Sequence, residues 1–288
     1  MDSDEDLSNA GLSDAWDVAI RYHEFKTRPS LSKVAHHLRE ISTAAILEKA
    51  RAVLGSVVHP TVSAVAPLDE IPGHAESVEL DLDETLESSP TLMSGGSLGS
   101  DPLMMEYRVR RSQPVVLAVD TSLSMTGEKL ALTAVALAVV ALQFPEDPIG
   151  IVAFENRATV LKRPGERITP AQLVARFLEV PAQGYTHLEE GMLGALRLVE
   201  ELEHGGRGRP PAVVLLTDGK YTAGKDPAYL APRFSHLHVM KMGSEKSSLL
   251  LCRELARLGR GSLREVPELQ ALPGVMYGVV KDLLRGRR

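Results

Sequence analysis

Residues 115–127 read Val115-Val-Leu-Ala-Val-Asp120-Thr-Ser122-Leu-Ser124-Met-Thr-Gly127, an apolar run that ends abruptly in a polar turn. The apolar half is rich in β-branched residues, which suits a parallel strand buried on both faces of a sheet. Asp120, Ser122 and Ser124 alternate along the turn and can converge beyond the carboxyl end of that strand, where open α/β sheets bind ligands. Carboxylate and hydroxyl oxygens without His or Cys favour a hard cation such as Mg²⁺ over zinc or copper.

Two later stretches place further oxygen-bearing side chains where they can reach the same crevice. Residues 212–217 form a second apolar run that ends in Asp218-Gly219, and Gly184-Tyr185-Thr186 lies in a turn between two helical patterns. Strand ends and loops of this kind meet at one edge of a parallel sheet. The candidate metal ligands are therefore Asp120, Ser122, Ser124, Thr186 and Asp218.

These five residues, in this order, resemble the metal-ion-dependent adhesion site of the von Willebrand factor type A family, which is written Asp-x-Ser-x-Ser, then a distant Thr and a distant Asp. The resemblance runs from Ser112 to the C-terminus. It implies that the five side chains bind Mg²⁺, or else Mn²⁺ or Ca²⁺. Most members carry Gly at the positions of Leu123 and Tyr185, so we expect an apolar and an aromatic side chain to rim the metal here.

The rest of the chain after residue 112 alternates strand and helix patterns, which predicts an α/β fold. We expect a Rossmann-like open, mostly parallel sheet with helices on both faces and one antiparallel edge strand, because residues 149–154 and 158–161 are separated by a short turn. If the strands follow the order of the family, 3-2-1-4-5-6, the strands at 115 and 213 are neighbours. Asp120 and Asp218 then flank one crevice.

The first part of the chain has a different character. Residues 12–55 show two segments with helical spacing, separated at Pro29-Ser30. Residues 57–102 are rich in Pro, Ser and Gly and predict loop for the most part, and residues 105–109 alternate like a strand that leads into the main sheet. We therefore expect an N-terminal helical extension and linker over residues 1–111, and a von Willebrand factor type A domain over 112–288.

Composition narrows the class of protein. The net charge of -6 argues against nucleic-acid binding, and a single cysteine, Cys252, excludes an internal disulfide framework. The acidic start of the chain lacks the features of a secretory signal. The longest apolar run, residues 130–144, is too short for a bilayer and predicts a buried core helix. We expect a cytoplasmic protein with no membrane span, in which Cys252 packs as an inert side chain.

The ligand set predicts binding rather than catalysis. A divalent ion held largely by neutral hydroxyl oxygens keeps much of its charge and an open position for an anionic oxygen. The resemblance implies that a Glu or Asp of a partner protein fills this position. Intracellular relatives accompany AAA+ ATPases of the MoxR or magnesium-chelatase kind, and because this chain has no Walker A sequence, any ATPase activity belongs to such a partner. We expect an adaptor module and not an enzyme.

Three alternatives stand beside this expectation. Asp81-x-Asp83-x-Thr85 is similar to the first motif of haloacid-dehalogenase-type phosphatases, and Mg²⁺-dependent phosphate-ester hydrolysis that disappears in Asp81→Asn would identify that chemistry. The ordinary interpretation is a strand or helix start with acidic surface residues. His187 either faces the metal as a base or occupies a helix N-terminus. Finally, the domain can be a structural module whose site binds no metal.

Overall fold

The chain divides into two units, one formed by residues 1–57 and 113–288 and the other by residues 58–112. The computed structural model describes residues 14–27, 34–54, 61–73, 75–89, 102–110, 113–145, 147–182, 184–204, 209–246 and 248–285. Each unit contains its own β-sheet. The two sheets are therefore described separately.

The larger unit is built on a six-stranded sheet with the order β6-β5-β4-β7-β8-β9. Its strands are β4 (Val115–Asp120), β5 (Ile149–Phe154), β6 (Ala158–Lys162), β7 (Ala212–Thr217), β8 (His236–Met242) and β9 (Arg260–Val266). All neighbours are parallel except β5 and β6, which form an antiparallel pair at one edge. Numbered along this sheet, the order is 3-2-1-4-5-6, so the predicted fold class and strand order are confirmed.

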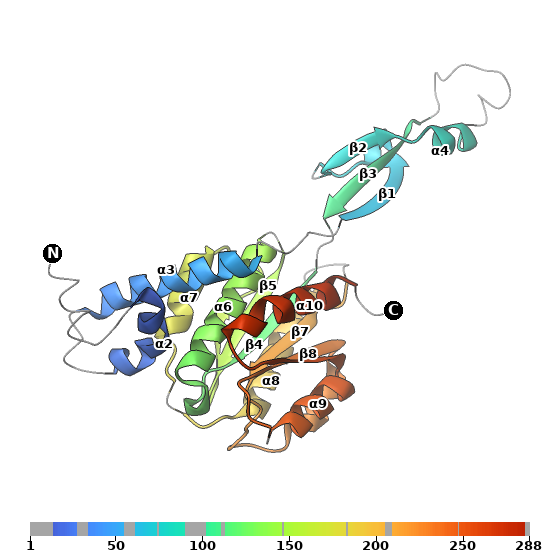
Figure 1. Cartoon of the computed structure of the whole chain (residues 1–288). Helices are drawn as coiled ribbons and strands as arrows, with labels where there is room; N and C mark the ends of the chain where they lie inside the picture. Colours follow the sequence, from blue (N-terminus) through green and yellow to red (C-terminus); the bar gives the residue numbers. More distant parts are fainter. Residues whose placement is uncertain are drawn as a thin grey trace, which may run out of the picture. The chain divides into compact units, whose positions relative to one another are not determined.

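The central strand β4 is buried along its whole length because both faces of the sheet are covered. Val115, Leu117 and Val119 join the core on one face, and Val116 and Ala118 join the core on the other. The first face is covered by α6 (Glu128–Gln143), α7 (Pro170–Glu179) and α10 (Leu272–Arg285). The second is covered by α8 (Leu188–His204), the 3-10 helix η4 (Pro227–Arg233) and α9 (Leu249–Leu258). Figure 1 shows these layers.

Helix α6 is the apolar run that the sequence predicts as a core helix. Its residues from Leu130 to Val140 are all buried, because the helix is packed between the sheet and other helices. It begins directly after the polar turn that follows β4. No helix in the described ranges combines the length and the apolar character of a membrane span.

Helices α2 (Ala15–Lys26) and α3 (Ala35–Leu54) confirm the predicted helical pair but belong to the larger unit. Helix α3 packs on α6 and α7, and its Ile46 is fully buried in the core of that face. The Lys26 ammonium donates to the backbone oxygens of Leu178 (3.1 Å) and Val180 (3.4 Å), where α7 ends. A division at residue 112 is present, but residues 1–57 belong with residues 113–288 and not with the expected N-terminal extension, because the first helices complete the core of the sheet domain.

The smaller unit is a three-stranded antiparallel sheet with the order β1-β3-β2. It contains β1 (Thr61–Pro67), the 3-10 helix η2 (Leu68–Glu70), β2 (Ser77–Leu80), α4 (Leu82–Glu87) and β3 (Met104–Arg110). Residues 61–67 and 77–87 therefore correct the prediction of loop. The predicted strand exists as β3, but it pairs with β1 and β2 rather than with the main sheet. Pairing between segments so far apart leaves little local signal in the sequence.

The single cysteine lies on α9 and faces the core. Burial raises the pKa of the Cys252 thiol to about 12. Because the thiolate is the reactive form, this thiol is inert at neutral pH, as the sequence predicts.

His238 on β8 makes stability depend on pH. Burial lowers the pKa of this imidazole to about 4, although nearby Asp282 opposes the shift. Its Nδ1 accepts from the backbone N–H of Ser262 (3.2 Å). Because the folded pKa lies below the unfolded value of about 6.5, the unfolded chain binds the proton first and stability is lost as the pH falls through this window.

We therefore expect His238→Asn, which keeps an acceptor, to remove this pH dependence. Relative to the variant, the wild-type protein should lose about 2 kcal/mol of unfolding free energy between pH 7 and pH 5. Urea denaturation of both proteins at the two pH values measures this difference. Parallel pH profiles for the two proteins would show that His238 takes up its proton equally in the folded and unfolded states.

Candidate metal centre

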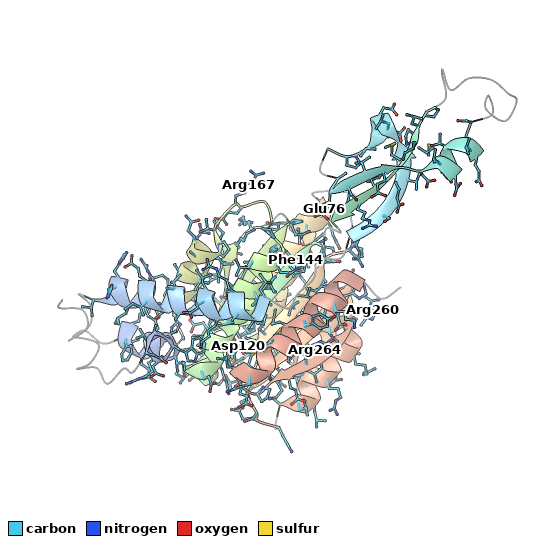
Figure 2. All side chains as sticks on the ribbon, turned by 45° about the horizontal axis from the view of Figure 1, so that its top comes forward. Glu76, Asp120, Phe144, Arg167, Arg260 and Arg264 are labelled. Atoms are coloured by element: carbon cyan, nitrogen blue, oxygen red, sulfur yellow. The ribbon has the colours of Figure 1, made fainter. Side chains whose placement is uncertain are left out.

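Asp120 ends β4 with its carboxylate fully buried. One oxygen, Oδ1, accepts from the backbone N–H of Ser122 (2.9 Å), which shapes the turn. The other, Oδ2, accepts from the hydroxyl of Thr217 at the end of the neighbouring strand β7 (2.6 Å). The carboxylate is therefore held at the carboxyl edge of two adjacent central strands. Figure 2 labels Asp120 beside the turn that leads to α6.

Ser122 and Ser124 present their hydroxyls from the same turn. Their Oγ atoms lie 3.2 Å apart, and Ser122 is buried. A short 3-10 helix, η3 (Leu123–Met125), curls the chain so that these alternate residues meet. Gly127 then adopts a φ of 78°, a conformation that residues with a Cβ rarely adopt, and α6 begins at the next residue. The turn supplies two neutral oxygens beside the Asp120 carboxylate.

Thr186 comes from a loop that is joined to this turn. The backbone N–H of Leu123 donates to the backbone oxygen of Gly184 (3.2 Å). Thr186 itself is buried, its N–H donates to the hydroxyl of Thr222 (3.0 Å), and its backbone oxygen accepts from the Thr222 N–H (3.0 Å). The loop after β7 thus holds Thr186 from the other side, and the three loops meet at one edge of the sheet.

Asp218 follows β7 and is also fully buried. Its Oδ1 accepts from the backbone N–H of Lys220 (3.1 Å), and its Oδ2 lies 3.3 Å from the Lys129 ammonium. Thr217 donates to Asp120 from the position directly before Asp218, so it links the two carboxylate segments. The structure therefore brings the five candidate residues to the edge at which the sequence places them.

The electrostatics of this edge suit a cation. Burial raises the pKa of Asp120 to about 6, the hydrogen bonds from Thr217 and Ser122 oppose that shift, and the charge of Asp218 adds to it. The fully buried carboxylates of Asp120 and Asp218, together with the hydroxyls of Ser122, Ser124 and Thr186 on the loops that meet here, offer an oxygen-only donor set. In the described part of the chain, no group of three or more His, Cys, Asp or Glu side chains could hold a metal ion. A metal ion at this edge would therefore need the hydroxyls of Ser122, Ser124 and Thr186 as ligands.

The two side chains at the usual glycine positions lie in the ligand-bearing turns and are exposed to solvent. Leu123 is 62% exposed and Tyr185 is 70% exposed. A third, Tyr221, is 40% exposed and precedes Thr222, the residue that holds Thr186. Each of the three ligand-bearing segments therefore carries one large apolar or aromatic side chain that faces solvent.

His187 and Asp81 take structural positions. His187 Nδ1 accepts from the backbone N–H of Glu190 (3.0 Å) at the start of α8, which confirms the helix N-terminus interpretation. Asp81 is the N-cap of α4, and its carboxylate accepts from the backbone N–H of Glu84 (3.0 Å). The segment is therefore a helix start with acidic surface residues, which is the ordinary interpretation of its sequence.

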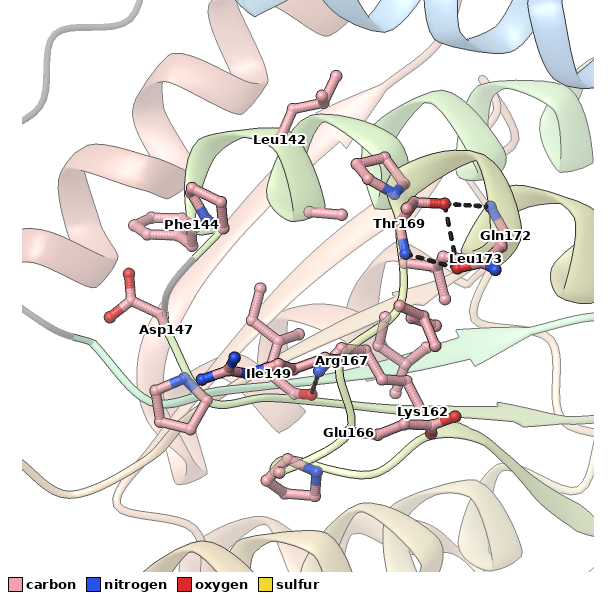
Figure 3. Close-up of a pocket in the computed structure, with 18 residues that line it drawn as sticks. Leu142, Phe144, Asp147, Ile149, Lys162, Glu166, Arg167, Thr169, Gln172 and Leu173 are labelled. Carbon is pink, nitrogen blue, oxygen red and sulfur yellow. Dashed lines mark hydrogen bonds between the residues drawn. The ribbon is translucent and has the colours of Figure 1, made fainter.

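A hollow of about 570 Å³ lies at the other end of the sheet, around Phe144, Ile149 and the start of α7 (Figure 3). Ile149 pairs with Val115, the first residue of β4, whereas Asp120 is the last. Among the polar residues that line the hollow, Thr169 and Gln172 form the capping box of α7, and Glu166 forms an ion pair with Arg176 (2.6 Å). We therefore do not include it in the candidate centre.

Sequence reasoning did not identify Thr217, Lys129 or Glu245 as parts of this site. Thr217 had a usable signal, because it is a polar residue at the end of an otherwise apolar buried strand. Lys129 and Glu245 form an ion pair of 2.7 Å across segments distant in the chain. No local pattern indicates that contact.

Residues 115–220 match the family model described as von Willebrand factor type A domain. An uncharacterized protein of Mycobacterium tuberculosis is 33% identical over 123 residues, which are 41% of this chain and 19% of the relative. The chain thus spans about a fifth of the length of that relative. The match covers a segment only.

Several solved structures superpose on this chain at low sequence identity. Proximal thread matrix protein 1 from the mussel byssus superposes with a TM-score of 0.50 at 17% identity, over 60% of this chain and 47% of that one. Another structure of that protein has zinc in its metal-ion-dependent adhesion site (MIDAS) motif. It superposes with a TM-score of 0.48 at 17% identity, over 60% of this chain and 48% of that one. A structure described as von Willebrand factor type A from Catenulispora acidiphila superposes with a TM-score of 0.49 at 15% identity, over 80% of this chain and 51% of that one.

Proposed function

We propose that the von Willebrand factor type A domain of this chain is a metal-dependent protein-binding module. Asp120, Ser122, Ser124, Thr186 and Asp218 would hold a divalent cation, and a carboxylate of a partner protein would complete its coordination. The observation that carries the proposal is the pair of fully buried carboxylates, Asp120 at the end of β4 and Asp218 directly after the adjacent β7, with the Ser122 and Ser124 hydroxyls in the turn that follows Asp120. Such a pair gains stability from a cation.

Mg²⁺ is the ion that we propose, with Mn²⁺ or Ca²⁺ as replacements. Oxygen ligands suit hard cations, and Mg²⁺ keeps part of its water shell rather than demanding a full protein cage. Three of the five ligands are neutral, so a bound ion would retain positive charge toward solvent. An incoming Asp or Glu carboxylate would neutralise that charge and replace water.

The exposed side chains of the ligand-bearing loops favour a protein rather than a small anion as the partner. Leu123, Tyr185 and Tyr221 lie in these loops and add exposed apolar area, which is typical of surfaces that bind other proteins. A carboxylate at the metal with apolar side chains around it would exclude water from the ionic contact. That contact then gains strength because the local dielectric constant is lower.

We also propose that this module acts in the cytoplasm as an adaptor for an AAA+ ATPase of the MoxR or magnesium-chelatase kind. The chain itself has no Walker A sequence, so nucleotide hydrolysis would be the work of the partner. The separate unit of residues 58–112 supplies an additional surface for such an assembly.

Capture from native lysate tests the protein-binding proposal. We expect the wild-type chain to recover a specific partner with Mg²⁺, and recovery to fall at least about tenfold with EDTA, which removes the proposed ion, or in Asp120→Ala, which removes one of its charged ligands, since losing a charged partner from a buried contact costs about 2–5 kcal/mol. Asp83→Ala, which removes an exposed carboxylate in the other unit, is the matched control and should behave as wild type. Equal recovery in every condition would defeat the proposal.

A further inference from the structure

Lys129 places an ammonium group directly against the candidate metal centre. It lies in the first turn of α6, immediately after the polar turn. Its Nζ donates to three acceptors: the backbone oxygen of Ser124 (3.2 Å), Oδ2 of Asp218 (3.3 Å) and Oε1 of Glu245 (2.7 Å). A lysine ammonium has three donors, so this one is fully used. The site thus contains a tethered cation.

The two buried carboxylates are therefore compensated differently. Asp120 accepts from a hydroxyl and a backbone N–H, both of them neutral donors. Asp218 has the Lys129 ammonium at 3.3 Å and the Lys220 ammonium at 3.8 Å from the same oxygen. A divalent ion that binds both aspartates must share Asp218 with these lysines, and like charges at such short range repel strongly.

Glu245 offers Lys129 an alternative position. Its Oε1 lies 2.7 Å from Lys129 and 3.5 Å from Lys220, so it draws both ammonium groups away from Asp218. Its Oε2 is buried and has no hydrogen-bond partner among the described residues. A Cβ at Gly243 would lie 2.6 Å from this Oε2 and 2.6 Å from Lys129 Cε, so the glycine leaves room for the two side chains. The second oxygen of Glu245 is thus an acceptor within reach of Lys129.

We propose that Lys129 is an internal counter-ion that competes with the metal for Asp218, and that Glu245 receives Lys129 when the metal binds. This inference rests on the proposed metal-binding function and adds its regulation. Lys129 and Glu245 are positioning residues, because they act on the ion through Asp218. The pair sets the metal affinity of the site, so the ion is held less tightly than two free aspartates would hold it.

Isothermal titration of the full chain with Mg²⁺, and separately with Mn²⁺, tests the pair. Lys129→Met removes the competing charge and should tighten binding by about tenfold. Glu245→Gln leaves both lysines on Asp218 and should weaken binding by about the same factor. In the double variant the effect of Glu245→Gln should shrink, because it acts through Lys129. Shifts of opposite sign distinguish this role from structural damage, which would weaken binding in both.

Lys162→Met is the matched control, because the Lys162 ammonium is also partly buried but donates to the backbone oxygens of Ile149 and Arg163. It should leave the affinity unchanged. If the wild-type protein binds the metal and both variants, Lys129→Met and Glu245→Gln, bind it with unchanged or weakened affinity, the inference is overturned while metal binding stands. If Lys129→Met binds the metal and the wild-type protein does not, the inference is supported. Absence of binding in all variants overturns the proposed function and this inference together.

Discussion

Adding Mg²⁺ at about 100 times its dissociation constant should stabilise the folded protein by about 2.7 kcal/mol, because the ion binds the assembled site and not the unfolded chain. For a sheet domain of this size, the melting temperature should rise by roughly 5–10 °C. The physical source is the attraction between the ion and the buried carboxylates, above all that of Asp120, which accepts hydrogen bonds only from neutral donors. Differential scanning fluorimetry with Mg²⁺, Mn²⁺, Ca²⁺ and EDTA measures the shift.

Asp120→Asn and Thr186→Ala remove a charged and a neutral ligand, and both should abolish or greatly reduce this shift. The matched controls are Asp83→Asn and Thr85→Ala, which make the same substitutions in the unit of residues 58–112 and should respond as wild type. If no divalent ion changes the melting temperature or gives a heat of binding, the domain is a structural module with a metal-free site, and the proposed function fails.

Ile46→Ala should destabilise the sheet domain by about 2–5 kcal/mol, although it lies in the N-terminal helices. Ile46 is fully buried on α3 and belongs to the same core as Val115 and Leu117 of β4. Removing its side chain leaves a cavity that the packed helices cannot fill. Urea denaturation followed by circular dichroism measures the loss.

The single tryptophan makes this experiment sharper. Trp16 lies on α2 and packs partly buried against the same core, so its fluorescence reports whether α2 stays packed on that core. If the helices and the sheet form one cooperative unit, the fluorescence and circular dichroism transitions should coincide in wild type and shift together in Ile46→Ala. Val78→Ala, at a half-exposed position of the smaller unit, should change the unfolding free energy of the sheet domain by no more than about 0.5 kcal/mol. A separate, earlier fluorescence transition would show that the helices unfold on their own.

The candidate ligands were accessible to sequence reasoning because each follows a local pattern. Asp120 and Asp218 end apolar runs, and such runs predict buried strands whose carboxyl ends meet. Ser122 and Ser124 share a turn with Asp120, so their proximity needs no long-range information. Thr186 was located by its turn between two helical patterns together with the family resemblance, because the hydrogen bond from Leu123 to Gly184 that joins its loop to the turn links segments far apart in the chain.

By itself, the sequence determined the alternation of strands and helices, the burial of the central strand on both faces, and the identity of the oxygen-bearing side chains at its end. These properties depend on the spacing of apolar and polar residues over a few positions, because that spacing decides which side chains share a face of a strand or helix. Only the tertiary structure decided that α3 completes the core, that β1, β2 and β3 form a sheet of their own, and that Lys129 and Glu245 meet beside Asp218. Contacts of this kind join segments far apart in the chain, so they arise from the packing of whole elements, and no short stretch of residues encodes them.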